Sequence, residues 1–253
     1  MKILLTNDDG FHAEGIKVLQ EIVSNIASKI WVVAPAENYS RASRSINQNV
    51  QINVQKVREN EFIVHGTPAE SVFIGLRKII NEKPDLILSG INHGSNVGND
   101  IIYSGTIGAA IEGAVMHIPS IAISQAYQDQ TIKWENSRKF LLDIIHKLMN
   151  NTNWKKSTTI SINIPCGDVK GIQFVEQGAY FSCNNIDVIQ TDNYSQSYVI
   201  REISPKNQYY KLNNRNIAAL YNGYIAITPI NTDMTDYNML NSLIQFNDNQ
   251  QCI

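Results

Sequence analysis

The protein has 253 residues, 43% hydrophobic and 17% charged, and its 21 basic and 23 acidic residues leave a formal net charge of −2. This near-neutral balance argues against nucleic-acid polymers and anionic membranes as partners, because both select a concentrated basic excess. No apolar run approaches the about 20 residues that span a bilayer, the N-terminus becomes polar too early for a signal peptide, and three scattered cysteines are typical of a reducing compartment, so we expect a cytoplasmic globular protein.

The first elements of the chain alternate between strand and helix. Lys2–Thr6 is an apolar run that ends in a polar turn, which indicates a buried strand. Ile16, Leu19, Val23, Ile26 and Ile30 then recur at helical spacing, and Ile30–Ala34 predicts a second buried strand that Pro35 stops. Strand, helix and strand in this order are typical of a parallel βαβ unit.

The same patterns continue to residue 165. They predict, in order, a hairpin over Ile46–Val64, a helix from Pro68, a strand over Pro84–Ser89, a helix from about Ser104 to Met116, a strand over Pro119–Ser124, a helix around Phe140–Leu148 and a strand over Thr158–Ile164. Beyond Pro165 short strands (Gln173–Glu176, Tyr198–Ile203 and Tyr224–Thr228) alternate with polar stretches and one short helix (Ile217–Tyr221). We therefore expect a single α/β domain over residues 1–253, with a Rossmann-like, doubly wound, mostly parallel sheet in 1–165 and a β-rich C-terminal extension in 166–253.

Oxygen-bearing side chains follow three of the predicted strands. Asp8 and Asp9 come after the first strand, Ser40 lies in the loop after the second, and Asn92 follows Pro84–Ser89. Ligands of open α/β sheets bind beyond the carboxyl ends of the strands, and hard oxygen donors suit Mg²⁺ or Mn²⁺. The sequence therefore predicts a divalent-cation site. The alternative interpretation is that Asp8, Asp9 and Gly10 form only a turn before the helix.

A glycine-rich loop leads into the helix that starts near Ser104. Its glycines are Gly90, Gly94, Gly98, Gly105 and Gly108. Such a loop offers backbone N–H groups to an anion, and the helix dipole with the hydroxyls of Ser104 and Thr106 favours phosphate. The alternative is a surface loop whose serine only caps the helix. We expect Gly105, Gly108 and Gly113 to let this helix pack on the sheet, and His93 to bind phosphate, orient Asn92 or serve structure alone.

Several other classes of phosphate chemistry do not match. A receiver domain needs an aspartate where this chain has Ser89-Gly90, and a haloacid-dehalogenase phosphatase needs its two aspartates separated by one residue. Neither a Gly-x-Gly-x-x-Gly turn nor a Walker Gly-Lys-Ser/Thr motif is present, which argues against dinucleotide and P-loop sites. The chain also lacks the Gly-x-Ser-x-Gly elbow of a Ser–His–Asp hydrolase.

The motifs together resemble the SurE survival-protein family of metal-dependent nucleotidases, along nearly the whole chain. The matching segments are Ile3–Gly10, Ala34–Ser43, Gly66–Pro68, Lys83–Leu86, Ser89–Gly94, Tyr103–Thr106 and Gly223–Pro229. The resemblance implies hydrolysis of nucleoside 5′-monophosphates to nucleoside and phosphate, with 3′-monophosphates and short polyphosphate as further substrates. It also implies a homodimer or homotetramer assembled through arms from the C-terminal half.

The resemblance further implies roles for individual residues. One divalent metal ion, Mg²⁺ or Mn²⁺, is bound by Asp8, Asp9, Ser40 and Asn92, and Asp8 or Asp9 orients the attacking water. We expect the substrate phosphate to be held by Asn96, His93, Ser104, Gly105 and Thr106.

Some positions depart from the family pattern. Tyr39 and Arg41 stand where Gln and Gly are usual, His65 replaces an Asn, and Arg215-Asn216 replaces a Thr-Asp pair. We expect Tyr39 and Arg41 to affect substrate preference at the rim of the site. None of these changes removes an expected metal ligand. The competing functional class is a non-catalytic nucleotide- or metal-binding protein on the same scaffold, which phosphate release from nucleoside monophosphates with and without EDTA distinguishes.

Overall fold

The structure of the protein, a computed structural model, describes residues 1–127, 131–179, 182–191, 195–202 and 215–250. Its strands are β1 (Lys2–Thr6), β2 (Lys29–Pro35), β3 (Val54–Arg58), β4 (Glu61–Val64), β5 (Leu86–His93), β6 (Ser120–Gln125), β7 (Thr158–Ile164), β8 (Gly171–Phe174), β9 (Cys183–Thr191), β10 (Gln196–Glu202) and β11 (Tyr224–Asn231). Its helices are α1 (Glu14–Val23), α2 (Pro68–Ile74), α3 (Asp100–Tyr103), α4 (Gly105–Val115), α5 (Glu135–Met149), α6 (Asn216–Tyr221) and α7 (Tyr237–Gln250), with a π-helical turn, η1 (Gly75–Ile79), after α2.

The main sheet of the described chain has nine strands in the order β3-β4-β2-β1-β5-β6-β7-β11-β8. The strands from β4 to β7 in this order run parallel, whereas β3 and β11 pair antiparallel with β4 and β7. The chain extends from β1 toward β2 and β4, and then from β5 in the opposite direction. The topological switch point therefore lies between β1 and β5, and the expected doubly wound, mostly parallel α/β fold is confirmed.

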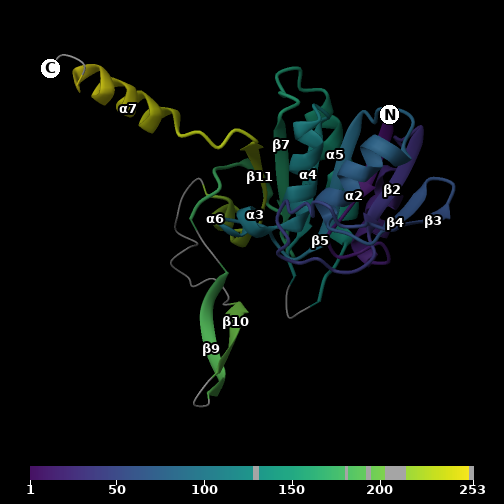
Figure 1. The fold of residues 1–253 in the computed structure, drawn as a ribbon. Helices are drawn as coiled ribbons and strands as arrows, with labels where there is room; N and C mark the ends of the chain where they lie inside the picture. Colours follow the sequence, from purple (N-terminus) through teal and green to yellow (C-terminus); the bar gives the residue numbers. More distant parts are fainter. Residues whose placement is uncertain (128–130, 180–181, 192–194, 203–214, 251–253) are drawn as a thin grey trace.

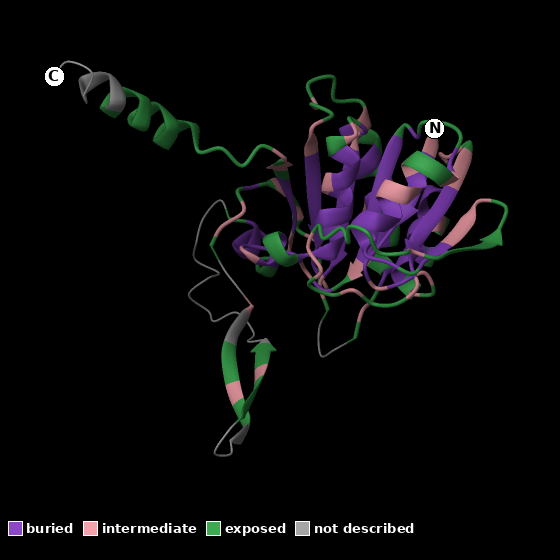
Figure 2. Cartoon of the chain, viewed as in Figure 1, coloured by how far each residue is buried: buried purple, intermediate pink, exposed green. Residues whose placement is uncertain are grey.

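Helices cover both faces of this sheet (Figure 1). Ile3 and Leu5 of β1 belong to the core under α1 and α5, while Leu4 packs in the core under α2 and α4. Successive strand side chains point to opposite faces, so a strand covered on both faces is apolar at every position. The buried centre of the sheet in Figure 2 is this double core, and it explains why the strands are visible in the sequence as continuous apolar runs.

Several boundaries differ from the predicted elements, and two of these differences have a clear cause in the sheet. Helix α1 ends at Val23 rather than continuing to Ile30, because Lys29 and Ile30 pair with Lys2 and Ile3 in the sheet. Strand β5 continues past the predicted end at Ser89 to His93, through a register shift between Ser89 and Asn92. That irregularity brings Asn92 onto the end of a strand rather than into a loop.

The segment after residue 165 divides into two kinds of structure. Strands β8 and β11 and helix α6 join the main sheet, with β11 between β7 and β8. The hairpin of β9 and β10 and the helix α7 extend away from the body of the protein (Figure 1). Neither β9 nor α7 was among the predicted elements, and Ile203, the predicted end of β10, lies outside the described residues. Like every other helix of the described ranges, α7 is not long and apolar enough to cross a membrane.

Candidate active site

The candidate site lies at the switch point of the sheet. Asp8 and Asp9 directly follow β1, Ser40 lies in the loop after β2, and Asn92 is at the end of β5. Strands β2, β1 and β5 are neighbours and run parallel, so their carboxyl ends meet at one edge. This is the edge at which open α/β sheets bind their ligands.

Hydrogen bonds connect the three strand ends. The backbone N–H of Tyr39, next to Ser40, donates to the carbonyl oxygen of Asp8 at 2.8 Å. The backbone N–H of His93, next to Asn92, donates to Asp9 Oδ2 at 3.1 Å. Thr106, in the first turn of α4, donates its hydroxyl to Asp8 Oδ1 at 2.5 Å. The two carboxylates are therefore the point at which the β2 loop, β5 and α4 converge.

The surroundings of the two carboxyl groups disfavour their ionisation. Asp8 is 5% exposed, and burial, together with the adjacent charge of Asp9, raises its pKa to about 7 despite the hydrogen bonds from Thr106. Burial also raises the pKa of Asp9, while the neighbouring His93 opposes the rise. Two adjacent carboxyls that resist ionisation in this way are stabilised as anions by a bound cation.

The neutral candidate ligands present oxygen lone pairs. Ser40 donates its hydroxyl hydrogen to Asn38 Oδ1 at 2.6 Å, so the lone pairs of its Oγ remain for a cation. Asn92 donates from Nδ2 to the carbonyl oxygen of Gly94 at 2.8 Å, which leaves its Oδ1 as an acceptor. In both residues the hydrogens are used within the protein, and the free atoms are the hard oxygens that Mg²⁺ and Mn²⁺ prefer.

Among the described residues, no group of three or more His, Cys, Asp and Glu side chains is placed to hold a metal ion. The expected ligand set contains only two carboxylates, and its other members are a hydroxyl and an amide. Such a set lacks the soft or nitrogen ligands of a structural zinc site and resembles the oxygen-rich, partly hydrated sites of magnesium. The residues present therefore fit a hard divalent cation.

Two glycines of α4 have a different role from the one predicted. A Cβ at Gly105 would lie 2.8 Å from Asp8 Cβ, and a Cβ at Gly108 would lie 2.1 Å from the carbonyl oxygen of Ser43 in the β2 loop. The expectation that both serve packing of the helix on the sheet was wrong, because these two face the site. Gly113 does face the sheet, where a Cβ would meet Ser120 Oγ at 2.4 Å.

The predicted phosphate-binding residues take several positions around the carboxylates. Ser104 caps α4 by accepting from the N–H of Ile107, next to Gly105 and Thr106. Asn96 is buried and donates from Nδ2 to Ser124 Oγ at 2.9 Å. The backbone N–H of His93 donates to Asp9, and the ring of His93 lies 5.3 Å from that of Trp134. Phosphate binding by these residues stays a prediction.

The departures from the family pattern also have a structural setting. Arg41 adopts a φ of +64°, in the left-handed region that favours the Gly expected there. Its guanidinium donates to Ser182 Oγ at 3.0 Å and lies 3.8 Å from Asp100, so it links the β2 loop to the start of the hairpin.

Sequence reasoning missed two residues near the site. Asn38 holds both the N–H and the hydroxyl of Ser40, and the Asn-x-Ser spacing of a side-chain turn is a signal that indicates it. Trp134 is buried beside His93 although it lies on a distant segment. No local sequence pattern predicts a contact between segments this far apart in the chain.

Comparisons with known proteins agree with this geometry. A family model described as Survival protein SurE matches residues 3–183. The chain is 53% identical over 248 residues to the 5′-nucleotidase SurE of Ehrlichia ruminantium (strain Welgevonden), covering 96% of this chain and 98% of that protein. It is 49% identical over 251 residues to the 5′-nucleotidase SurE of Wolbachia pipientis subsp. Culex pipiens (strain wPip), with 96% and 93% covered.

A solved structure extends the agreement to the fold. The crystal structure of the SurE protein from Aquifex aeolicus superimposes with a TM-score of 0.83 at 33% identity, covering 98% of this chain and 100% of that one. The family model spans most of the chain, and the relatives are matched over nearly their full lengths. The chain therefore belongs to the SurE family.

Proposed function

We propose that the protein is a metal-dependent 5′-nucleotidase, which hydrolyses nucleoside 5′-monophosphates to nucleoside and phosphate. The feature that supports this function above all others is the convergence of Asp8 and Asp9 with the β2 loop that carries Ser40 and the end of β5 that carries Asn92. The relatives at 53% and 49% identity carry the name 5′-nucleotidase. Nucleoside 3′-monophosphates and short polyphosphate present the same terminal phosphate and are further candidate substrates.

Asp8, Asp9, Ser40 and Asn92 would hold one Mg²⁺ or Mn²⁺ ion in each subunit. When bound, the cation would neutralise phosphate charge and lower the energy of the transition state. Asp9, which is less buried than Asp8, orients the attacking water by accepting its hydrogen bond. The water supplies an OH group to phosphorus and a proton to the leaving nucleoside oxygen as the ester P–O bond breaks.

The N-terminus of α4 is the second part of the phosphate site. Ser104, Gly105 and Thr106 begin this helix next to Asp8. First-turn N–H groups and the helix dipole stabilise negative charge, which grows on the phosphoryl oxygens during transfer. Thr106 also holds Asp8 in place through its hydroxyl. Asn96 and His93 are the further phosphate contacts that we propose.

Replacing Asp9 by Asn tests this function. We expect phosphate release from AMP and GMP with Mn²⁺ or Mg²⁺ to fall by about 10³-fold or more, as for other parts of a catalytic centre, and EDTA to abolish the wild-type activity. Calorimetric titration with Mn²⁺ should show binding to the wild type and weakened binding to the variant. Asp143→Asn, on the exposed side of α5, is the matched control.

Three outcomes of these measurements would contradict the proposed function. Full activity of Asp9→Asn contradicts the assigned site, and phosphate release that is indifferent to EDTA indicates a metal-free phosphatase. Binding of Mn²⁺ and nucleotide without hydrolysis by the wild type identifies a non-catalytic binding protein instead.

We also propose that the protein is a homodimer or homotetramer. The hairpin of β9 and β10 exposes apolar side chains, and so does α7, whose residues at i, i+1, i+4, i+5 and i+7 form one stripe. The exposed residues are Ile186, Val188, Ile189, Tyr198 and Ile200 on the hairpin, and Met239, Leu240, Leu243, Ile244 and Phe246 on α7. Exposed apolar surface of this extent is typical of an interaction site.

A further inference from the structure

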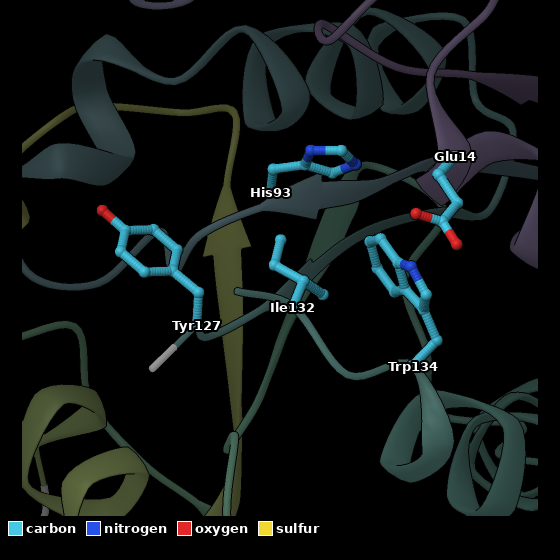
Figure 3. Close-up of a pocket in the computed structure, with 5 residues that line it drawn as sticks. All are labelled: Glu14, His93, Tyr127, Ile132 and Trp134. Atoms are coloured by element: carbon cyan, nitrogen blue, oxygen red, sulfur yellow. The ribbon is translucent and has the colours of Figure 1, made fainter. Parts of the chain in front are cut away.

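A pocket of about 470 Å³ lies beside the end of β5 (Figure 3). It is lined by Glu14, His93, Tyr127, Ile132 and Trp134. These residues come from the start of α1, the end of β5, the segment after β6 and the segment before α5. Three of the five are aromatic or imidazole rings, and the only carboxylate among them is Glu14. None of them belongs to the proposed metal or phosphate contacts except His93.

Two residues that line the pocket, His93 and Tyr127, connect it to the residues of the proposed metal site. His93 contacts Asp9 through its backbone N–H and contributes its ring to the pocket. The ring of Tyr127 lies against Gly94, where a Cβ would be 2.9 Å from Tyr127 Cε1, and the carbonyl of Gly94 holds Asn92. A molecule whose phosphate reaches Asp9 and Asn92 therefore has this pocket beside it.

Trp134 and Glu14 provide the pocket with a hydrogen-bond donor and an acceptor. Trp134 is 7% exposed, and its Nε1 is buried with no hydrogen-bond partner among the described residues. Figure 3 shows this nitrogen on the edge of the ring turned toward the carboxylate of Glu14. Glu14 is exposed, so its side chain can rotate and give a ligand access to the indole N–H. A buried donor without a partner is a site where a ligand acceptor gains a hydrogen bond.

We propose that this pocket binds the nucleobase of the substrate and that Glu14 makes it prefer guanine. This inference rests on the proposed nucleotidase function and adds the substrate's base to it. The ring face of Tyr127 offers a stacking surface, which every base can use. The carboxylate of Glu14 accepts two hydrogen bonds from the adjacent N1–H and N2–H groups of guanine, and the indole N–H of Trp134 donates to the neighbouring O6.

Other bases match this pair of groups less well. Adenine offers the carboxylate one exocyclic amino group beside an acceptor nitrogen, and cytosine offers the same pattern. Uracil offers a single N–H between two carbonyl oxygens, which a carboxylate repels. A paired contact to a base edge discriminates by about 1–3 kcal/mol, which is roughly five- to 150-fold. We therefore expect the order guanine, then adenine and cytosine, then uracil.

The test compares Glu14→Gln with the wild type on the four substrates GMP, AMP, CMP and UMP. We expect the wild type to show a kcat/KM for GMP about tenfold above that for AMP, the size of one base-edge contact. In Glu14→Gln this ratio should fall close to one. Glu135→Gln is the matched control, because Glu135 is an exposed glutamate next to Trp134 that does not line the pocket. It should keep the wild-type ratio.

A second readout separates the pocket from the chemistry. Calorimetric titration with guanosine and adenosine, without metal, measures base binding alone. We expect guanosine to bind the wild type more tightly than adenosine does, and Glu14→Gln to lose this difference. If no nucleotide is hydrolysed but this pattern holds, the proposed function fails and the base pocket stands.

Other results overturn the inference. An unchanged ratio of GMP to AMP in Glu14→Gln shows that Glu14 does not read the base. Glu14 also lies in the first turn of α1, where the interaction of a carboxylate with the helix dipole stabilises the helix. If Glu14 only stabilises the helix, Glu14→Gln has a lower melting temperature and the base preference of the wild type. That result contradicts the inference. Equal binding of guanosine and adenosine to the wild type contradicts guanine preference.

Discussion

The catalytic edge and the two C-terminal arms are built by opposite means. At the edge, polar side chains are buried and their neighbours are held by close backbone contacts, as at Gly105 against Asp8 and Gly108 against Ser43. In the arms, apolar side chains such as Ile200 and Leu243 are more than half exposed. The edge is therefore specified within one chain, whereas the arms have apolar surface that a single chain leaves uncovered.

This difference separates two kinds of mutational response. A change at the edge alters distances between groups that act together, so it affects the reaction more than the stability. A change in an arm alters a surface that meets another molecule, so it affects association more than the reaction. The experiments below test that separation, and they run from the largest expected effect on activity to the smallest.

Gly108→Ala should give the largest effect. The new Cβ would lie 2.1 Å from the carbonyl oxygen of Ser43, so the loop that carries Ser40 must move. A displacement of about 1 Å at a catalytic group costs about 100-fold in rate, and we expect a loss of kcat/KM of that size. Steady-state kinetics with GMP and Mn²⁺ measures it.

Gly113→Ala is the control on the same helix. Its Cβ would meet Ile87 Cδ1 at 2.5 Å, on the sheet side. Overpacking there should lower the free energy of unfolding by about 1–3 kcal/mol, with kcat/KM changed by less than about twofold because the site is distant. Equal losses of activity in the two variants would contradict the assignment of Gly108 to the site.

Thr106→Val should give an intermediate effect. It keeps the shape of the side chain and removes the hydroxyl that donates to Asp8 Oδ1. Partners that orient a metal ligand are worth about 10- to 100-fold in metal affinity. We expect the Mn²⁺ concentration that gives half-maximal activity to rise about tenfold, which a metal titration measures.

Thr159→Val is the matched control for Thr106→Val, because it makes the same change at another buried position. Thr159 is fully buried in β7, and its hydroxyl has no hydrogen-bond partner among the described residues. Its replacement should leave the Mn²⁺ requirement as in the wild type. A similar rise in both variants would show that the effect of Thr106 is not specific to Asp8.

Leu243→Glu in α7 should give the smallest effect on the reaction. A charge on the apolar stripe opposes burial of that face, so we expect light scattering to report a smaller assembly and kcat/KM to change by less than about threefold. Gln245→Glu adds the same charge to the opposite face of α7 and should keep the wild-type mass. A monomeric wild type would contradict the proposed assembly.

The same contrast explains how much the sequence could predict. The parallel strands β1, β2, β5, β6 and β7 were predicted because both of their faces are largely buried, which makes them mostly apolar. Strand β9 and helix α7 were missed because their apolar residues do not serve the core of their own chain. The extension of β5 to His93 was missed because a register shift depends on the neighbouring strand β6.

The candidate site follows a similar rule. Asp8, Asp9, Ser40 and Asn92 could be grouped from the sequence, because the ends of parallel strands meet at one edge. The contact of Gly108 with Ser43, and that of Trp134 with His93, could not be predicted. Each joins segments far apart in the chain, and its existence depends on how a helix is placed over the sheet.

The place of β11 in the sheet has a consequence for synthesis on the ribosome. Within the described sheet, β8 pairs with β11 alone, yet residues 175–223 must be translated between them. Until β11 emerges, β7 also presents an unpaired edge, which is a template for pairing with other chains. A nascent chain therefore completes this sheet only after β11 has been translated, and products truncated before β11 expose the edges of β7 and β8 to pairing with other chains.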